Sequence, residues 1–120
     1  WECWNDPQHI MQWAFASDDW ECPAAENDPR VEGRFKNTMA AKDKSMSFDF
    51  SGTYTVVDLH QRLDYTLDDD RKVSVVFTET PEGVQVVQSF EAEPENPIHF
   101  QQLGWQAILD NFATYAESRA

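Results

Sequence analysis

The spacing of apolar residues gives the C-terminal part of the chain a helical period. Over residues 96–119, Trp105, Ile108, Phe112 and Tyr115 fall at i, i+3, i+7 and i+10. Residues with this spacing lie on one face of an α-helix, so the segment predicts a single long amphipathic helix. A helix with such an apolar stripe needs a second layer to pack on.

The predicted helix also carries signals at its start and within its length. Asn96 is a favourable N-cap, and Pro97 suits the first helical position because its missing N–H costs nothing there. Gly104 lies in the middle of the helix, where glycine costs about 1 kcal/mol relative to alanine. This cost indicates that the helix approaches a sheet closely at Gly104, or leaves room there for something between them.

Between residues 31 and 91 the apolar residues recur at every second position, as they do in strands with one buried face. Gly52, inside the most regular of these segments, indicates a bulge or bend. Short polar turns join the segments, so consecutive strands are expected to pair antiparallel. The pattern predicts five strands, at residues 31–39, 46–56, 59–67, 71–78 and 83–91.

The first 29 residues are less regular. Pro7 interrupts the first apolar segment, with Asp6 in front of it as a cap, which predicts two short helices within residues 1–16. Residues 17–29 are rich in acids and turn formers and predict a loop. The whole order predicts an α+β fold, a curved antiparallel sheet wrapped around the long C-terminal helix, as a single domain over residues 1–120.

The net charge of the chain limits the classes of partner that it can bind. A net charge of −13, from 22 acidic and 9 basic residues, repels phosphate backbones and anionic lipid headgroups, so we expect neither nucleic-acid nor membrane binding. Cys3 and Cys22 have neither the spacing of a metal pair nor the density of a disulfide scaffold. They favour reduced thiols in a cytoplasmic protein, although a bridge between them stays open.

Five segments spread over nearly the whole chain occur in the same order in a known family. They are residues 4–7 with His9 and Trp13, residues 30–35, residues 50–54, residues 62–66, and residues 102–105 with 108–111. In these segments the chain resembles bacterial proteins similar to the C-terminal domain of the activator of the Hsp90 ATPase. Those proteins belong to the START-like, or Bet v 1-like, helix-grip superfamily.

The chain departs from the family pattern at two places. Family members usually carry a first strand ahead of the segment that begins here at Trp1, and this sequence lacks it. Its absence would leave a sheet edge open, which a homodimer could cover. The second departure is Glu32, where the family often has glycine.

The resemblance implies a cavity between the sheet and the C-terminal helix, which relatives use for hydrophobic small molecules. Apolar residues on the inner faces of the predicted elements are the candidate liners, unless they fill the space completely. His9 and Tyr54 are the candidate polar groups of the cavity. The candidate liners are Trp13, Phe35, Met39, Phe48, Phe50, Tyr65, Phe77, Phe90, Trp105, Ile108 and Phe112.

We therefore expect a bacterial, cytoplasmic domain that binds a small hydrophobic or lipid-like molecule and has no chemistry of its own. The alternative is an enzyme of the polyketide cyclase or hydrolase type, with His9, Tyr54 or Tyr65 as acid–base candidates. No nucleophile–base pair, phosphate loop or metal motif accompanies them, so no catalytic residue, metal or cofactor is assigned. An interaction domain for an Hsp90-type chaperone ranks last, because the resemblance leaves out the Hsp90-binding half of the co-chaperone.

Overall fold

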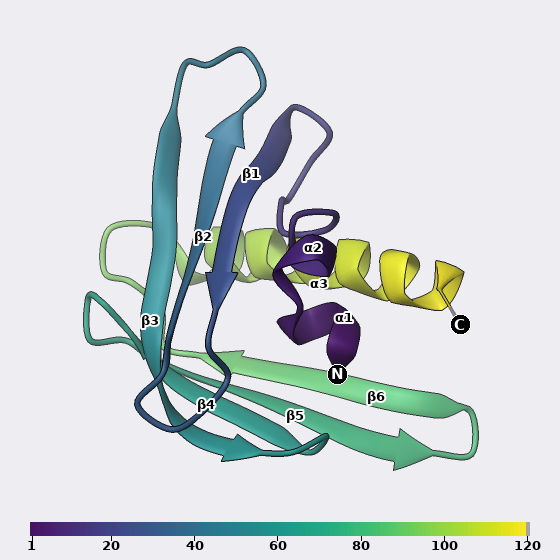
Figure 1. Ribbon diagram of the computed structural model, residues 1–120. Helices are drawn as coiled ribbons and strands as arrows, with labels where there is room; N and C mark the ends of the chain where they lie inside the picture. Colours follow the sequence, from purple (N-terminus) through teal and green to yellow (C-terminus); the bar gives the residue numbers. More distant parts are fainter. Residues whose placement is uncertain (120) are drawn as a thin grey trace.

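Six antiparallel strands curl into a half-barrel, and a long helix crosses its open side (Figure 1). The structure is a computed structural model that describes residues 1–119. Its strands are β1 (Trp20–Asn27), β2 (Arg34–Ala41), β3 (Ser47–Asp58), β4 (Arg62–Leu67), β5 (Lys72–Thr80) and β6 (Gly83–Phe90), and its helices are α1 (Glu2–Asn5), α2 (Pro7–Ile10) and α3 (Ile98–Ser118). Each strand pairs with its neighbour in sequence. The predicted α+β fold, with a curved sheet around a C-terminal helix and two short N-terminal helices, is confirmed.

The predicted loop at residues 17–29 is wrong, because it contains the edge strand β1. Only Cys22 is buried in this strand, so the apolar alternation that marks the other strands is missing. The register of its pairing with β2 shifts between Glu21 and Ala24, and Pro23 lies inside this bulge. Proline lacks an N–H for the strand ladder and is tolerated at bulges and edges, which explains why the segment looked like a loop.

Two other strands, β2 and β4, begin three residues later than predicted, at Arg34 and Arg62. Glu32 and His60 precede them with φ of 68° and 65°, in the left-handed region, where an extended chain cannot continue. Leu59 consequently lies in a turn and is exposed instead of facing the core.

The bulge predicted at Gly52 lies slightly further along β3, between Tyr54 and Val56. It shifts the alternation by one, so that Val57 packs against the core in place of Val56. Gly52 has a different role: a Cβ there would lie 2.6 Å from the carbonyl oxygen of Thr66 on β4. The glycine therefore allows a close approach of two strands.

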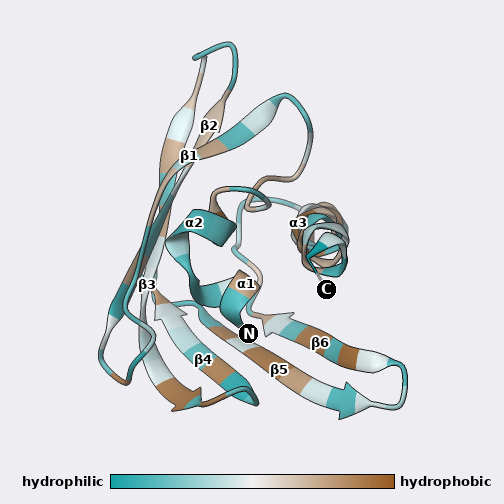
Figure 2. Ribbon diagram, turned by 45° about the vertical axis from the view of Figure 1, so that its right-hand side comes forward, coloured by the Kyte–Doolittle hydropathy of each residue, from teal (hydrophilic) through white to brown (hydrophobic). Residues whose placement is uncertain are grey.

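The C-terminal half of α3 is held firmly by the N-terminal segment, which lies inside the bend of the sheet (Figure 2). The ring of Phe112 lies 4.8 Å from that of Trp4 and 5.0 Å from that of Trp13. Asn111 Nδ2 donates to the carbonyl oxygen of Phe15 at 2.7 Å. Phe112 is the buried residue of α3, so this aromatic cluster is the point at which the helix joins the core.

The start of α3 is organised by Gln101, and the predicted N-cap at Asn96 is wrong. The helix begins at Ile98, with Pro97 in the cap position and no side-chain cap. Gln101 Nε2 donates to the carbonyl oxygens of Glu93 and Asn96, at 2.9 and 2.7 Å, and its Oε1 accepts from the Glu93 N–H at 2.8 Å. The loop before the helix is therefore tied back to the first helical turn.

Both cysteines are free thiols, and Cys22 is buried. Burial raises the pKa of the Cys22 thiol above its ordinary value. Within residues 1–119, no helix combines the length and the apolar character needed to cross a membrane.

Candidate functional site

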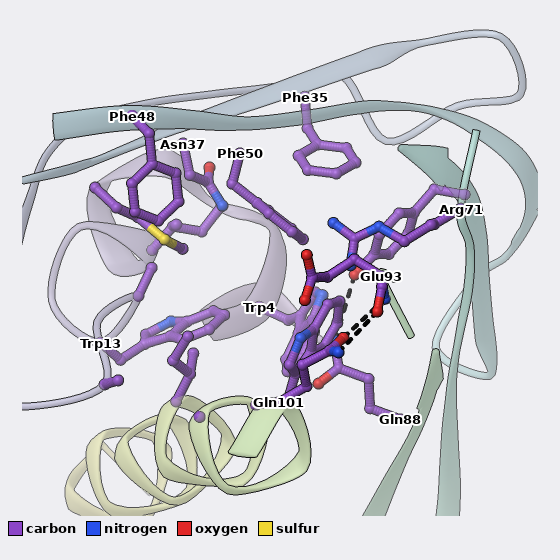
Figure 3. A pocket seen from close by; sticks show the side chains of 18 of the residues that line it. Trp4, Trp13, Phe35, Asn37, Phe48, Phe50, Arg71, Gln88, Glu93 and Gln101 are labelled. Carbon is purple, nitrogen blue, oxygen red and sulfur yellow. Dashed lines mark hydrogen bonds between the residues drawn. The ribbon is translucent and has the colours of Figure 1, made fainter. Parts of the chain in front are cut away.

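A cavity of about 490 Å³ lies between the inner face of the sheet and the N-terminal half of α3 (Figure 3). Strand β2 contributes Phe35, Asn37 and Met39, because alternate residues of a strand face the same side. The other apolar or aromatic liners are Trp4, Ile10, Trp13, Ala14, Ala16, Phe48, Phe50, Tyr54, Tyr65, Phe100, Trp105 and Ile108, with Gly104 among them. The wall is therefore mostly apolar and aromatic, as is usual for a small-molecule site.

Trp105 keeps the helix away from the sheet on this side. Its ring stacks on that of Phe90 at 4.2 Å with an interplanar angle of 6°, and it meets the edge of Phe50 at 5.7 Å. Gly104, one residue earlier, faces open space, since a Cβ built there would have no atom within 4 Å. The room that the mid-helix glycine indicated is thus present, and it lies in the cavity.

Most of the predicted liners meet at this cavity, but three lie outside its lining. Phe77 packs against the rings of Trp1 and Trp4, at 5.2 and 5.9 Å, and belongs to the core. Phe112 occupies the aromatic cluster described above, and Phe90 lies behind Trp105. Phe77 and Phe112 are buried among other side chains, whereas Phe90 is half-buried and stacked on Trp105.

Of the two predicted polar groups, only Tyr54 lines the cavity. Its hydroxyl donates to Asn27 Oδ1 at 2.6 Å, and Asn27 Nδ2 donates to the carbonyl oxygen of Asn5 at 2.8 Å. His9 lies outside the lining, where its Nδ1 is 2.6 Å from the Tyr115 hydroxyl on the last turns of α3. His9 therefore serves the attachment of α3.

The two tyrosines in the wall are poor proton donors at neutral pH. Burial raises the pKa of Tyr54 and of Tyr65 well above the ordinary value. Tyr65 also accepts a hydrogen bond from Gln88 Nε2 at 3.3 Å. An acid–base catalyst needs a pKa near the working pH, so these phenols are suited to hydrogen bonding and not to proton transfer.

Sequence reasoning missed the polar residues of the cavity, which are Asn27, Asn37, Arg71, Gln88, Glu93, Asn96 and Gln101. Figure 3 shows Asn37 between Phe48 and Phe50, and Arg71, Glu93 and Gln101 near one another. Arg71 Nε bonds Asp69 Oδ2 at 2.7 Å. The signal for Asn37 was present: it interrupts an otherwise apolar strand face.

One group of potential metal ligands is found in the described part of the chain, away from the cavity. Glu2, Asp6 and His9 each bring a ligand atom within 4.8 Å of the others. All three lie on the short helices or between them, and none belongs to the cavity lining.

The chain is similar in sequence to one protein family and in structure to several solved proteins. Residues 1–117 match the profile of a family described as activator of Hsp90 ATPase homolog 1-like protein. An AHSA1-like protein from Aeromonas hydrophila is 46% identical, with a TM-score of 0.93, over 99% of this chain and 83% of that one. A protein from Cytophaga hutchinsonii is 50% identical, with a TM-score of 0.82 over the same shares, and one from Chromobacterium violaceum is 25% identical, with a TM-score of 0.82, over 94% and 83%. No curated protein matches the chain.

Proposed function

Because this chain belongs to the activator of Hsp90 ATPase homolog 1-like family, within the START-like helix-grip proteins, we propose that it binds a small apolar molecule between the sheet and α3. The observation that carries the proposal is the apolar cavity beneath the N-terminal half of the helix. Apolar surface that enters such a space leaves water and gains about 25 cal/mol per Å². The protein acts in this proposal as a carrier or sensor, without chemistry of its own.

The volume of the cavity sets the size of the molecule. A ligand of about 13–25 non-hydrogen atoms fits a space of about 490 Å³, which is in the lower half of the usual range for ligand pockets. One or two fused or linked aromatic rings, or a branched chain of similar size, match the aromatic wall.

Binding is favoured over catalysis by the state of the polar groups. The phenols of Tyr54 and Tyr65 keep their protons at neutral pH, and His9 lies outside the lining. We propose that the protein binds its ligand in the bacterial cytoplasm. The thiols of Cys3 and Cys22 are free, as is usual in that reducing compartment. A chaperone of the Hsp90 type is not part of the proposal.

Filling the cavity from the helix tests the proposal. Gly104→Leu adds four carbon atoms at a position that faces open space, and it replaces a poor helix former with a good one. The variant should fold at least as well as the wild type. Ala113→Leu, on an exposed position of the same helix, is the matched control because it adds bulk outside the cavity.

The assay is a titration with N-phenyl-1-naphthylamine, an uncharged fluorescent probe of suitable size, together with native mass spectrometry of the purified protein. We expect saturable binding to the wild type and to Ala113→Leu, and at least tenfold weaker binding to Gly104→Leu. Absence of saturable binding to the wild type, or equal binding to a folded Gly104→Leu, contradicts the proposal.

A further inference from the structure

We propose that Asn37 selects an uncharged, hydroxyl-bearing ligand, an inference that rests on the proposed binding function. Within residues 1–119, Asn37 Oδ1 is the buried side-chain oxygen or nitrogen that has no hydrogen-bond partner. Buried polar atoms are nearly always paired in proteins, and leaving one unpaired destabilises the fold. That oxygen is enclosed by protein, whereas the amide nitrogen, which has no hydrogen bond within residues 1–119 either, is directed into the cavity (Figure 3). The unpaired N–H groups of this nitrogen therefore point to an acceptor that arrives with the ligand.

The position of Asn37 supports this assignment. It lies between Phe35 and Met39 on the inner face of β2 and pairs across the sheet with Phe50. All three neighbours line the cavity, so the amide is surrounded by apolar side chains on this part of the wall (Figure 3). Any apolar residue of similar shape would pack there without an unpaired atom, which leaves packing alone as a poor explanation of the asparagine.

The amide is able to meet either half of a hydroxyl group. Its oxygen accepts and its nitrogen donates, and a half-turn about its terminal torsion exchanges the two. A hydroxyl both donates and accepts, so it pairs with the amide in either orientation. A site built to hydrogen-bond a hydroxyl also discriminates strongly against the analogue that lacks it, because the protein group is then left unpaired.

The charges around the cavity disfavour an anionic ligand. Glu93 lines it, and the chain carries a net charge of −13. Arg71, the lining cation, is bonded through Nε to Asp69 at 2.7 Å. A carboxylate would therefore enter a field of its own sign, whereas a neutral hydroxyl has no such cost.

The test compares three probes that share one body: biphenyl-4-ol, 4-methylbiphenyl and biphenyl-4-carboxylate. Their affinities are measured by displacement of N-phenyl-1-naphthylamine. The quantity of interest is the ratio of the dissociation constants of the methyl and hydroxyl probes, compared between wild type and Asn37→Leu. The different transfer costs of the two probes from water cancel in this comparison, as in a double-mutant cycle.

We expect Asn37→Leu to lower this ratio about tenfold or more, which corresponds to the loss of one hydrogen bond to a buried group. Asn37→Ala, which removes the amide without adding apolar atoms, should lose the same preference. Ala113→Leu, at an exposed position of α3 outside the cavity lining, should leave the ratio unchanged. The carboxylate should bind the wild type more weakly than the hydroxyl probe.

The outcomes distinguish a failure of this inference from a failure of the proposed binding function. If the probes bind but the ratio is the same in wild type and both Asn37 variants, the selection by Asn37 is refuted while binding stands. Tighter binding of the carboxylate than of the hydroxyl probe refutes the uncharged class. If the dye binds but no probe displaces it, the selection by Asn37 is refuted while the binding function stands. If the dye itself does not bind, the binding function fails and the inference fails with it.

Discussion

Removing the Phe112 side chain tests how α3 is attached to the rest of the molecule. Phe112 is 6% exposed and packs against the rings of Trp4 and Trp13. A buried aromatic side chain covers about 150–250 Å², which at 25 cal/mol per Å² is worth roughly 4–6 kcal/mol as an upper bound. Phenylalanine-to-alanine changes in cores cost about 3–5 kcal/mol, so we expect Phe112→Ala to lower the free energy of unfolding by about 4 kcal/mol.

Phe100→Ala is the matched control on the same helix. Phe100 is 66% exposed, so its removal should cost less than about 0.5 kcal/mol. The assay is urea denaturation followed by tryptophan fluorescence and far-UV circular dichroism, with the midpoint and slope compared between variants. Phe112→Leu, expected to cost about 1–2 kcal/mol, provides a measurable variant if the alanine variant is too unstable to fold.

Native-state hydrogen exchange supplies an independent measurement of the same attachment. Amides in the N-terminal half of α3, above the cavity, should open at lower free energy than those around Phe112. Equal costs for Phe112→Ala and Phe100→Ala, or uniform protection along α3, would refute the reasoning.

Three further predictions concern stability. Asn37→Leu should raise the free energy of unfolding by about 1 kcal/mol and the melting temperature by roughly 3–5 °C, because it removes an unpaired buried oxygen; calorimetry showing a lower melting temperature contradicts this. Glu32→Gly should raise the free energy of unfolding by about 0.5–1 kcal/mol, because Glu32 has a φ of 68°, which glycine adopts more easily than glutamate. An unchanged or lower urea midpoint would contradict this prediction. Hydrogen bonds from Arg34 and Ser51 hold the pKa of Asp68 below its ordinary 3.8, so the folded state gains stability above that pH and loses it as the pH falls through the lower folded value. The difference in urea midpoint between wild type and Asp68→Asn should therefore vanish at low pH, and a difference that persists there counts against the prediction.

Most of the fold could be predicted from the regular spacing of apolar residues along the chain. The stripe of Trp105, Ile108 and Phe112 identified α3, and alternate apolar residues identified β2 to β6, because each of these elements buries one face. The edge strand β1 was missed because it buries only Cys22 and carries a proline in its bulge. Hydrogen bonding along the backbone, which side-chain patterns do not record, is what makes β1 a strand.

The site was less accessible to sequence reasoning than the fold. Phe50 and Phe112 are both apolar residues on inner faces, yet one borders open space and the other fills the core. That difference depends on the distance between helix and sheet, which Trp105 sets by stacking on Phe90. No local pattern contains this distance. Asn37, by contrast, was visible as a polar interruption and needed only to be treated as meaningful.

Because α3 is attached more tightly at its C-terminal half than at its N-terminal half, different residues control the affinity and the exchange rate of the ligand proposed for the cavity. Lining residues determine how tightly a ligand is held, whereas the contacts that keep the N-terminal half of α3 on the sheet determine how quickly it enters and leaves. Phe90 belongs to the second set alone, since it holds Trp105 in place without lining the cavity. Under the proposed binding function, changes at Phe90 should therefore alter the residence time of the ligand while the residues that contact the ligand stay the same.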